Sequence, residues 1–122
     1  MWERGIIFRG KKTTNNELVY GFLCENISGK YCIQEAHNDE FGYNVTSHEV
    51  FIDSIEQFTG ETDDNGVNIF EGDNCVLFID ADEDVDFKVI FENGAFMMQF
   101  EDGDTDYLGE YSSRGVVSVK NN

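Results

Sequence analysis

Seven residues hold the chain's densest group of potential cation ligands: Asp80-Ala81-Asp82-Glu83-Asp84-Val85-Asp86. An EF-hand calcium loop needs glycine at its sixth position and glutamate at its twelfth. Counted from the first residue of the run, those positions hold Val85 and Phe91, and counts that start at Asp102 or Glu61 also fail. The pattern is typical of a solvated loop between strands, and no metal is predicted to bind it.

The same carboxylates could instead face another molecule. The candidate acidic interaction surface comprises Asp80, Asp82, Glu83, Asp84 and Asp86. An acidic surface can attract a basic partner, or it can simply keep a small domain soluble. The sequence leaves both interpretations open.

The two histidines, His37 and His48, have acidic neighbours at Asp39, Glu40 and Glu49. A metal site built from histidine and carboxylate ligands is therefore one hypothesis. The spacing matches no standard metal site, and a polar loop explains both histidines equally well. We predict no bound metal and no cofactor.

Glu71 and Asp73 could be taken for a pair of catalytic carboxylates. The two carboxylates of a glycosidase come from opposed segments that flank a sugar cleft. Here a single glycine separates the two acids, and a strand that bends at Gly72 explains them better. We predict no catalytic residue and a protein that is not an enzyme.

Cys24, Cys32 and Cys75 lie in apolar, strand-like segments, where free cysteine usually fills the core. An odd number of cysteines without a CxxC pair suits a reducing cytoplasm. The first nine residues lack the apolar core of a signal peptide, and no run approaches the ~20 apolar residues that span a bilayer. We expect a cytoplasmic protein.

Charge narrows the choice of partners. The chain has 25 acids and 8 bases, a formal net charge of −17. Residues 37–122 hold 21 of the acids and 3 of the bases, which gives −18 for that part. Nucleic-acid binding depends on Lys and Arg, and anionic membranes also repel acids. We expect no direct binding to either, whereas a basic protein partner is compatible with the charge.

Short alternating apolar runs without proline predict a mainly β protein. Residues 17–24 and 30–34 are expected to form a hairpin around a turn at 26–29. Residues 36–48 are polar and are expected to form a loop. Residues 48–58 fit either an irregular strand or one helical turn.

The second half is expected to consist of short strands joined by tight turns. Asn65-Gly66 is expected to form a type I′ turn, and Asn93-Gly94 another tight turn. Residues 75–79 form an apolar run typical of a strand buried on both faces. Residues 107–111 and 116–119 are expected to be the final strands. The predicted core contains Phe87, Val89, Phe91, Phe96, Met98 and Phe100.

Three motifs follow one another in the middle of the chain: Gln57-Phe58-Thr59-Gly60, Asp63-Asp64-Asn65-Gly66 and Ile69-Phe70-Glu71-Gly72-Asp73. Further short segments accompany them: Phe8-Arg9-Gly10-Lys11, Leu18-Val19-Tyr20-Gly21 and Asn93-Gly94-Ala95-Phe96. Together they resemble the pattern of the YopX-like proteins of phages and prophages. The C-terminal part departs from that pattern, since only Gly109-Glu110-Tyr111 remains and proline is missing.

The signature residues are interpreted as structural: Gln57, Phe58, Thr59, Gly60, Asp63, Asn65, Gly66, Ile69, Phe70, Glu71, Gly72 and Asp73. The resemblance implies a mainly β fold with an SH3-like small β-barrel in the C-terminal half, and a phage or prophage protein in a bacterial host. It implies no catalytic residues. We expect an N-terminal β-hairpin region over residues 1–50, and the signature and barrel over residues 51–122.

Three functions follow from these observations. The first is a non-enzymatic accessory protein that binds another protein, because an SH3-like barrel offers an edge strand and an aromatic groove for peptides. The second is an acidic DNA mimic that inhibits a host nucleic-acid-binding protein. The third is a metal-dependent hydrolase. The sequence leaves the oligomeric state open.

Overall fold

The computed structural model describes residues 7–120 as a mainly β protein with two antiparallel sheets and one short helix. The chain divides into two compact units, Met1–Gln57 and Phe58–Asn122. One sheet contains six strands and the other contains five.

The first unit is an antiparallel meander. Its elements are β1 (Phe8–Lys11), β2 (Leu18–Glu25), β3 (Tyr31–Asp39), β4 (Gly42–Glu49) and the 3-10 helix η1 (Ile52–Ser54). The expected hairpin of β2 and β3 is present. Its turn forms because the side-chain oxygen of Asn26 accepts hydrogen bonds from the backbone N–H groups of Ser28 and Lys30.

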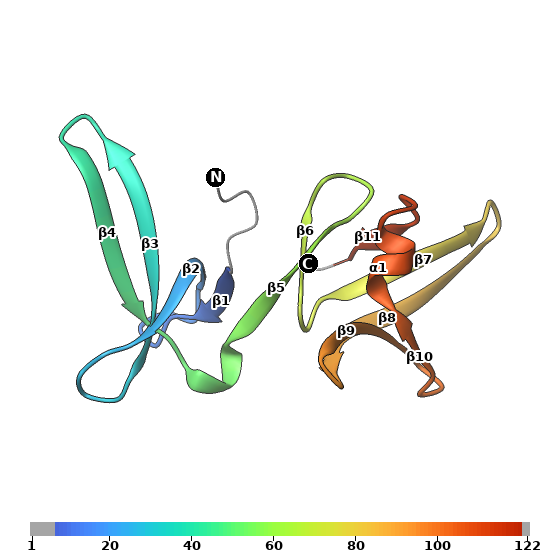
Figure 1. The fold of residues 1–122 in the computed structure, drawn as a ribbon, viewed down its shortest axis with the longest axis horizontal. Coiled ribbons are helices and arrows are strands. Elements are labelled where there is room, and N and C mark those ends of the chain that lie inside the picture. The colour runs from blue at the N-terminus through green and yellow to red at the C-terminus, as the bar shows by residue number, and fades with distance from the viewer. Residues whose placement is uncertain (1–6, 121–122) are drawn as a thin grey trace. The chain divides into compact units, whose positions relative to one another are not determined.

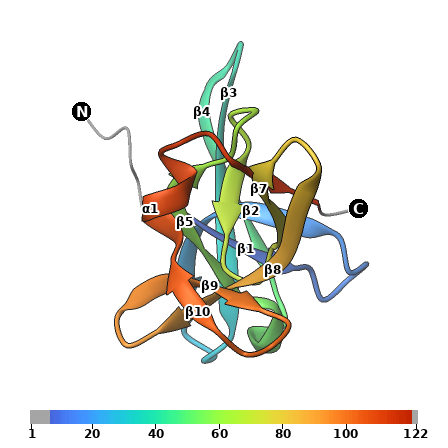
Figure 2. The same ribbon diagram turned by 90° about the vertical axis from the view of Figure 1, so that its right-hand side faces the viewer.

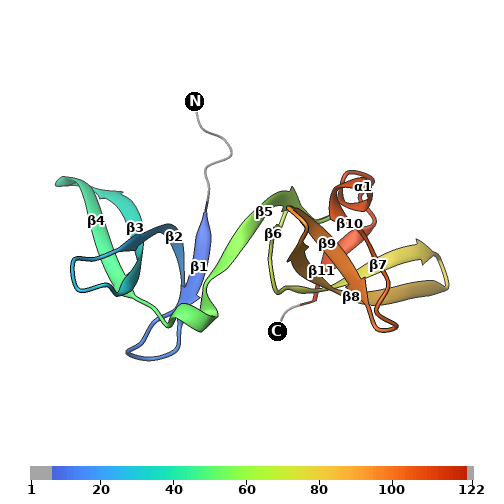
Figure 3. The ribbon, with the colours of Figure 1, turned by 60° about the horizontal axis from the view of Figure 1, so that its bottom comes forward.

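The prediction of a loop over residues 36–48 is wrong, because these residues form most of a second hairpin, β3–β4. The hairpin extends well beyond its neighbouring strands (Figures 1 and 3). Its outer residues are exposed on both faces, so they lack the apolar alternation by which a half-buried strand is recognised. The side chains of His37 and Thr46, 3.1 Å apart, instead hydrogen bond across the ladder.

The core of the first unit is small. Its buried apolar side chains are Val19, Ile33 and Val50, with four partly buried residues packed against them. Residues 48–58 combine both expected alternatives, since η1 is one short turn and β5 (Glu56–Thr62) follows it. At the start of β5, Glu56 Oε1 lies 2.8 Å from Nε of the buried Arg9.

The second unit contains most of the remaining strands. They are β6 (Asn68–Phe70), β7 (Asn74–Asp80), β8 (Glu83–Glu92), β9 (Ala95–Phe100), β10 (Thr105–Tyr107) and β11 (Val117–Val119). Figure 2 shows β7 to β10 as a bent sheet with the helix α1 (Leu108–Ser112) beside it. Within residues 7–120 the sheet does not close into a barrel, because its order begins with β10 and ends with β11.

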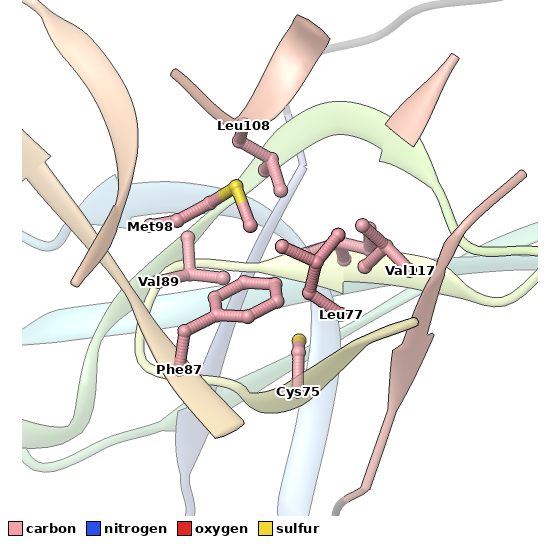
Figure 4. Packing of buried hydrophobic residues seen from close by; sticks show 8 residues of the cluster. Cys75, Leu77, Phe87, Val89, Met98, Leu108 and Val117 are labelled. Carbon is pink, nitrogen blue, oxygen red and sulfur yellow. The ribbon is translucent and has the colours of Figure 1, made fainter. Parts of the chain in front are cut away.

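One apolar cluster holds the second unit together. Its buried members are Ile69, Cys75, Leu77, Phe87, Val89, Met98, Leu108 and Val117. Side chains from β7, β8 and β9 converge with Leu108 of α1 and Val117 of β11 (Figure 4). Each fully buried side chain of this kind contributes roughly 1.5–3 kcal/mol.

Most of the predicted core is confirmed. Phe87, Val89 and Met98 are buried, and Phe96 and Phe100 pack against them. The prediction that Phe91 is a core residue is wrong, because 52% of its surface is exposed. It lies near the end of β8 opposite Phe96, where the two rings meet edge to face with centroids 4.9 Å apart.

Two further expectations about strands need correction. Residues 75–79 are not buried on both faces: Cys75 and Leu77 are buried on one face, whereas Phe78 on the other face and Ile79 near the end of the strand are exposed. Residues 107–111 do not form a strand, because β10 ends at Tyr107 and α1 follows. Leu108 and Ser112 are buried at the spacing of a helix, but a segment of five residues is too short to reveal a helical period in the sequence. The final strand at 117–119 is confirmed.

Candidate functional site

The signature turn is organised by a buried carboxylate, that of Asp63, which is only 7% exposed. Asp63 Oδ1 accepts hydrogen bonds from the backbone N–H groups of Asn65 (2.8 Å) and Val67 (2.9 Å). Its other oxygen, Oδ2, accepts one from the N–H of Val119 at 3.0 Å. One side chain therefore fixes the turn and attaches it to β11.

These bonds decide the ionisation of Asp63. Burial by itself would raise the pKa of the carboxyl group, since it disfavours the charged form. The three backbone hydrogen bonds outweigh that effect and hold the pKa of Asp63 below its ordinary value. The carboxylate is thus a structural anion already supplied with donors.

The prediction of a type I′ turn at Asn65-Gly66 is wrong. Such a turn needs a positive φ at both central residues, whereas Gly66 has a φ of 79° and Asn65 has no positive φ. The Gly66 N–H instead donates to the Asp63 carbonyl at 3.0 Å, as in a longer hairpin loop that ends in a left-handed glycine. At the other expected tight turn, both Asn93 (53°) and Gly94 (82°) have positive φ.

The flanking signature residues also hold structure. The rings of Phe58 and Phe70 lie across the β5–β6 pair with centroids 5.5 Å apart. The Thr59 hydroxyl donates to the Ile69 carbonyl at 2.7 Å and accepts from the N–H of Glu61 at 3.1 Å. These contacts fix the register of the hairpin.

The Glu71-Gly72-Asp73 segment forms the next bend. Asp73 is 1% exposed, and its Oδ2 accepts a hydrogen bond from the Phe70 N–H at 2.8 Å. Gly72 has a φ of 90°, and its N–H donates to the Val89 carbonyl at 2.8 Å. The structure therefore gives Asp73 a role in closing a bend, as the sequence interpretation expected of this segment.

The candidate acidic surface lies at one end of the β7–β8 hairpin. All of its carboxylates are exposed, and Asp80 pairs directly with Glu83 across the ladder. Asp82 occupies the turn, where its N–H donates to Asp80 Oδ1 at 2.9 Å. Asp86 lies farther along β8 and forms an ion pair of 2.9 Å with Lys120. The other four carboxylates lie close together and form no ion pair with any residue that the structure describes.

The two histidines do not converge. His48 of β4 lies opposite Ile33 of β3, whereas His37 lies on β3 itself, opposite Asn44. Ile33 and His37 are four residues apart, which at 3.3 Å per residue separates the two histidines by roughly 13 Å along the strands. His48 Nε2 lies 3.2 Å from Glu35 Oε1. Among the side chains that the structure describes, no group of three or more His, Cys, Asp or Glu residues could hold a metal ion.

The cysteines are free, and two of them are neighbours. Cys24 and Cys32 lie directly opposite each other in the β2–β3 ladder. Burial, together with Cys24 and Glu49 nearby, raises the pKa of the Cys32 thiol. Cys75 is fully buried in the core of the second unit. A raised pKa makes Cys32 a poor nucleophile at neutral pH.

A hollow of about 580 Å³ in the second unit gathers charges of both signs. Its lining includes Lys88, Lys120, Asp86 and Glu101. Lys120 is already paired with Asp86, and the negative charge of Glu101 balances the positive charge of Lys88 in the lining. The hollow therefore offers little net charge to a ligand.

A different surface, in the first unit, was missed by sequence reasoning. Directly paired residues of an antiparallel sheet lie on one face, as do alternate residues along each strand. By the observed register, one face of β2–β3–β4 continues outward from Cys32 and Glu49 into Tyr20, Phe22, Gln34, Ala36, Asn38, Tyr43, Val45 and Ser47. We refer to these eight residues as the aromatic face.

The eight residues of the aromatic face are uncharged, and all of them except the partly buried Gln34 are exposed. Charged residues border them at Glu49 and at Arg9, which lies opposite Tyr20. Phe22 is 55% exposed and Tyr43 is 67% exposed, and Tyr20 and Val45 are exposed to a similar degree. The opposite face of the same strands holds the buried Val19 and Ile33. The available signal was that β2 is apolar on both faces, but Tyr43 and Val45 fell in a segment expected to be a loop.

The fold and the signature hairpin together define a small, mainly β protein whose characteristic acids support the backbone. Its sequence matches the YopX protein family over residues 7–118, so the chain belongs to the YopX family. The resemblance found from the motifs is thereby confirmed. No curated protein matches the chain. Among the described residues, none of the helices has the length and apolar character needed to cross a membrane.

Proposed function

We propose that this YopX-family chain is a non-enzymatic accessory protein of a phage or prophage, and that it acts in the bacterial cytoplasm by binding another protein. The aromatic face carries the proposal. Single exposed apolar residues are common on soluble proteins, whereas a contiguous exposed patch is typical of an interaction surface. Here Tyr20, Phe22, Tyr43 and Val45 lie on one face of neighbouring strands, among uncharged residues, in a chain with net charge −17.

The uses of the acidic signature residues support the same proposal. Asp63 and Asp73 accept backbone hydrogen bonds, so their carboxylates serve the fold. An SH3-like relationship of the second unit also belongs to the proposal. It is supported by the consecutive antiparallel pairing of β7 to β10 and by the tight turn between β8 and β9.

The test compares matched surface variants of the full chain. Phe22→Ser and Tyr43→Ser together remove two aromatic rings from the aromatic face. Ile79→Ser and Phe91→Ser remove two exposed apolar side chains from the second unit. Proteins captured by the wild-type chain from host lysate are identified, purified and titrated back against all three chains. We expect binding that the first double variant weakens at least tenfold and the second leaves unchanged.

Two results would contradict the proposal. One is a purified partner that binds both double variants as tightly as the wild type. The other is the failure of every purified candidate to bind the wild-type chain at micromolar concentrations. Circular dichroism of both variants establishes that any loss of binding is not a loss of folding.

The acidic surface favours a second candidate, a DNA mimic that occupies the nucleic-acid-binding groove of a host protein. Its supporting observation is the cluster of exposed carboxylates at the end of the β7–β8 hairpin. Changing Asp80, Asp82 and Asp84 to Asn should then abolish inhibition of that host protein. A control triple change of Glu101 to Gln and of Asp102 and Asp104 to Asn alters net charge equally at another turn. Equal inhibition by both variants would exclude the hairpin end.

A further inference from the structure

The strand at the border of the aromatic face lacks the common protections of an edge strand. β4 is the terminal strand of its sheet, next to β3 only. Natural edge strands are commonly protected by lysine, proline, a bulge or short length. β4 runs for eight residues, Gly-Tyr-Asn-Val-Thr-Ser-His-Glu, with no lysine or proline, and its register with β3 has no shift. The Glu49 carbonyl already accepts a hydrogen bond from the Thr13 N–H at 3.0 Å, so the row of backbone donors and acceptors that β4 presents runs from Gly42 to His48.

Carboxylates mark the two ends of this edge. Glu49 ends β4, and Glu40 lies in the turn immediately before it. Between them, residues 42–48 carry no acid and no permanent positive charge. Lys30 lies 3.7 Å from Glu49 at an exposed position, where such a pair is readily exchanged.

This distribution argues against a second copy of the chain as the occupant. Antiparallel pairing of β4 with itself along its full length would bring Glu49 of one copy to the turn that contains Glu40 of the other. That clash would occur twice in a symmetric dimer. Like charges placed opposite each other destabilise strand pairs, and each copy has a net charge of −17.

We propose that β4 binds an extended segment of a basic partner protein as an added strand. The segment has apolar side chains at alternate positions, which continue the aromatic face beyond Tyr43 and Val45. A lysine or arginine near each of its ends lies next to Glu40 and Glu49. Strand addition of this kind takes affinity from main-chain hydrogen bonds and specificity from alternate side chains. The inference rests on the proposed function, since it names the partner's chemistry.

Synthetic peptides test the inference on the full chain. The probe is Lys-Val-Thr-Phe-Thr-Val-Thr-Lys, which alternates and carries basic ends. One reference peptide has glutamate in place of both lysines, and another has the probe's composition with its three apolar residues adjacent. Fluorescence anisotropy measures affinity, and ¹⁵N–¹H spectra with amide exchange locate the peptide.

We expect the probe to bind at least tenfold more tightly than either reference peptide, which corresponds to about 1.4 kcal/mol. Amide shifts and slowed exchange should be concentrated in β4. Val45→Lys, which places a charge on the aromatic face at the edge strand, should abolish binding. Val67→Lys makes the same change at an exposed position of the other unit and should bind the probe as the wild type does.

Strand addition is wrong if the probe fails to bind at millimolar concentration, or if the glutamate peptide binds equally well. A dimer in sedimentation experiments whose formation is prevented by Val45→Lys would assign the edge to a second copy instead. A purified partner that depends on Phe22 and Tyr43 but leaves the β4 amides unchanged would retain protein binding as the function and reject only this mode.

Discussion

Asp63 shows how a single acidic side chain can determine a local structure. Three backbone N–H groups donate to its two oxygens, and the group is buried. A hydrogen bond to a charged partner is worth about 1.5–3 kcal/mol, and a buried donor left without an acceptor costs about 1–3 kcal/mol. Asp64, the next residue of the same turn, is exposed to solvent.

We predict that Asp63→Asn lowers the free energy of unfolding by about 2–3 kcal/mol, because an amide supplies one acceptor oxygen where the carboxylate supplies two. Asp64→Asn is the matched control, since Asp64 is exposed, and should stay within about 0.5 kcal/mol of the wild type. Urea denaturation measures both. Equal stability of the two variants would show that the bonds to Asp63 contribute nothing net.

The contribution of Asp63 should also be visible in the pH dependence of the free energy of unfolding. The pKa of Asp63 is lower in the folded chain than in the unfolded chain, so its contribution is fully present above the unfolded value of about 3.9. As the pH falls below about 4, the unfolded chain binds a proton first and stability declines. Asp63→Asn should flatten this decline. Parallel curves for the two proteins in urea titrations between neutral and acidic pH would contradict the assignment.

At the scale of the element, the ladder of β2 and β3 has two consequences. The first concerns Cys24 and Cys32, which are direct cross-strand partners. Opposite Cα atoms in such ladders lie about 4.5–5.5 Å apart, within the range that a disulfide can bridge. We predict that mild oxidation with diamide joins these two cysteines without unfolding the chain.

Mass spectrometry after thiol alkylation tests this prediction. The oxidised chain should lose two hydrogen atoms and retain one alkylation site, at the buried Cys75 after denaturation. Cys75→Ser should leave the reaction unchanged, whereas Cys24→Ser should abolish the intramolecular product. Oxidation that yields only disulfide-linked dimers would contradict the prediction.

The second consequence concerns Gly21, at which β2 approaches β3 closely. A Cβ at this position would overlap the backbone carbonyl oxygen of Gln34. We predict that Gly21→Ala lowers the free energy of unfolding by about 2 kcal/mol or more, since the ladder must open to accept it. Gly109→Ala is the control, because α1 has room there and alanine favours a helix. Thermal denaturation should separate the two variants clearly.

The elements also show what sequence could and could not predict. Strands with a buried face and a tight turn, such as β8 and β9, were predicted because alternation and Asn93-Gly94 are local signals. The outer part of the β3–β4 hairpin, over residues 36–48, was missed because its pairing satisfies the backbone while its side chains stay largely exposed. The aromatic face was missed for a related reason: it is defined by register across three strands, and no window of sequence contains that register.

At the scale of the whole molecule, the two units differ in the size of their cores. In the described residues, the first unit buries Val19, Ile33 and Val50 in its cluster, whereas the second buries eight apolar residues. Burial of apolar surface is the main favourable term in folding. The first unit should therefore open at a lower free energy than the second.

Native-state hydrogen exchange followed by mass spectrometry checks this expectation. Amides of β2 and β3 should exchange at a lower concentration of denaturant than those of β7 and β8. Ile33→Val should accelerate exchange in the first unit, and Val89→Ala should do so in the second. Identical exchange free energies across both units would show that they unfold as one cooperative structure.

The bond between Asp63 and the Val119 N–H joins positions 56 residues apart. During synthesis, the turn that contains Asp63 emerges from the ribosome long before its third donor does. A nascent chain at that stage already exposes the phenylalanines of β8 and β9 but cannot complete the anchorage of its turn. Chaperones and proteases would thus act on the incomplete chain mainly late in translation. A ribosomal pause ahead of codon 119 should therefore lower the yield of native protein more than an equal pause ahead of codon 63.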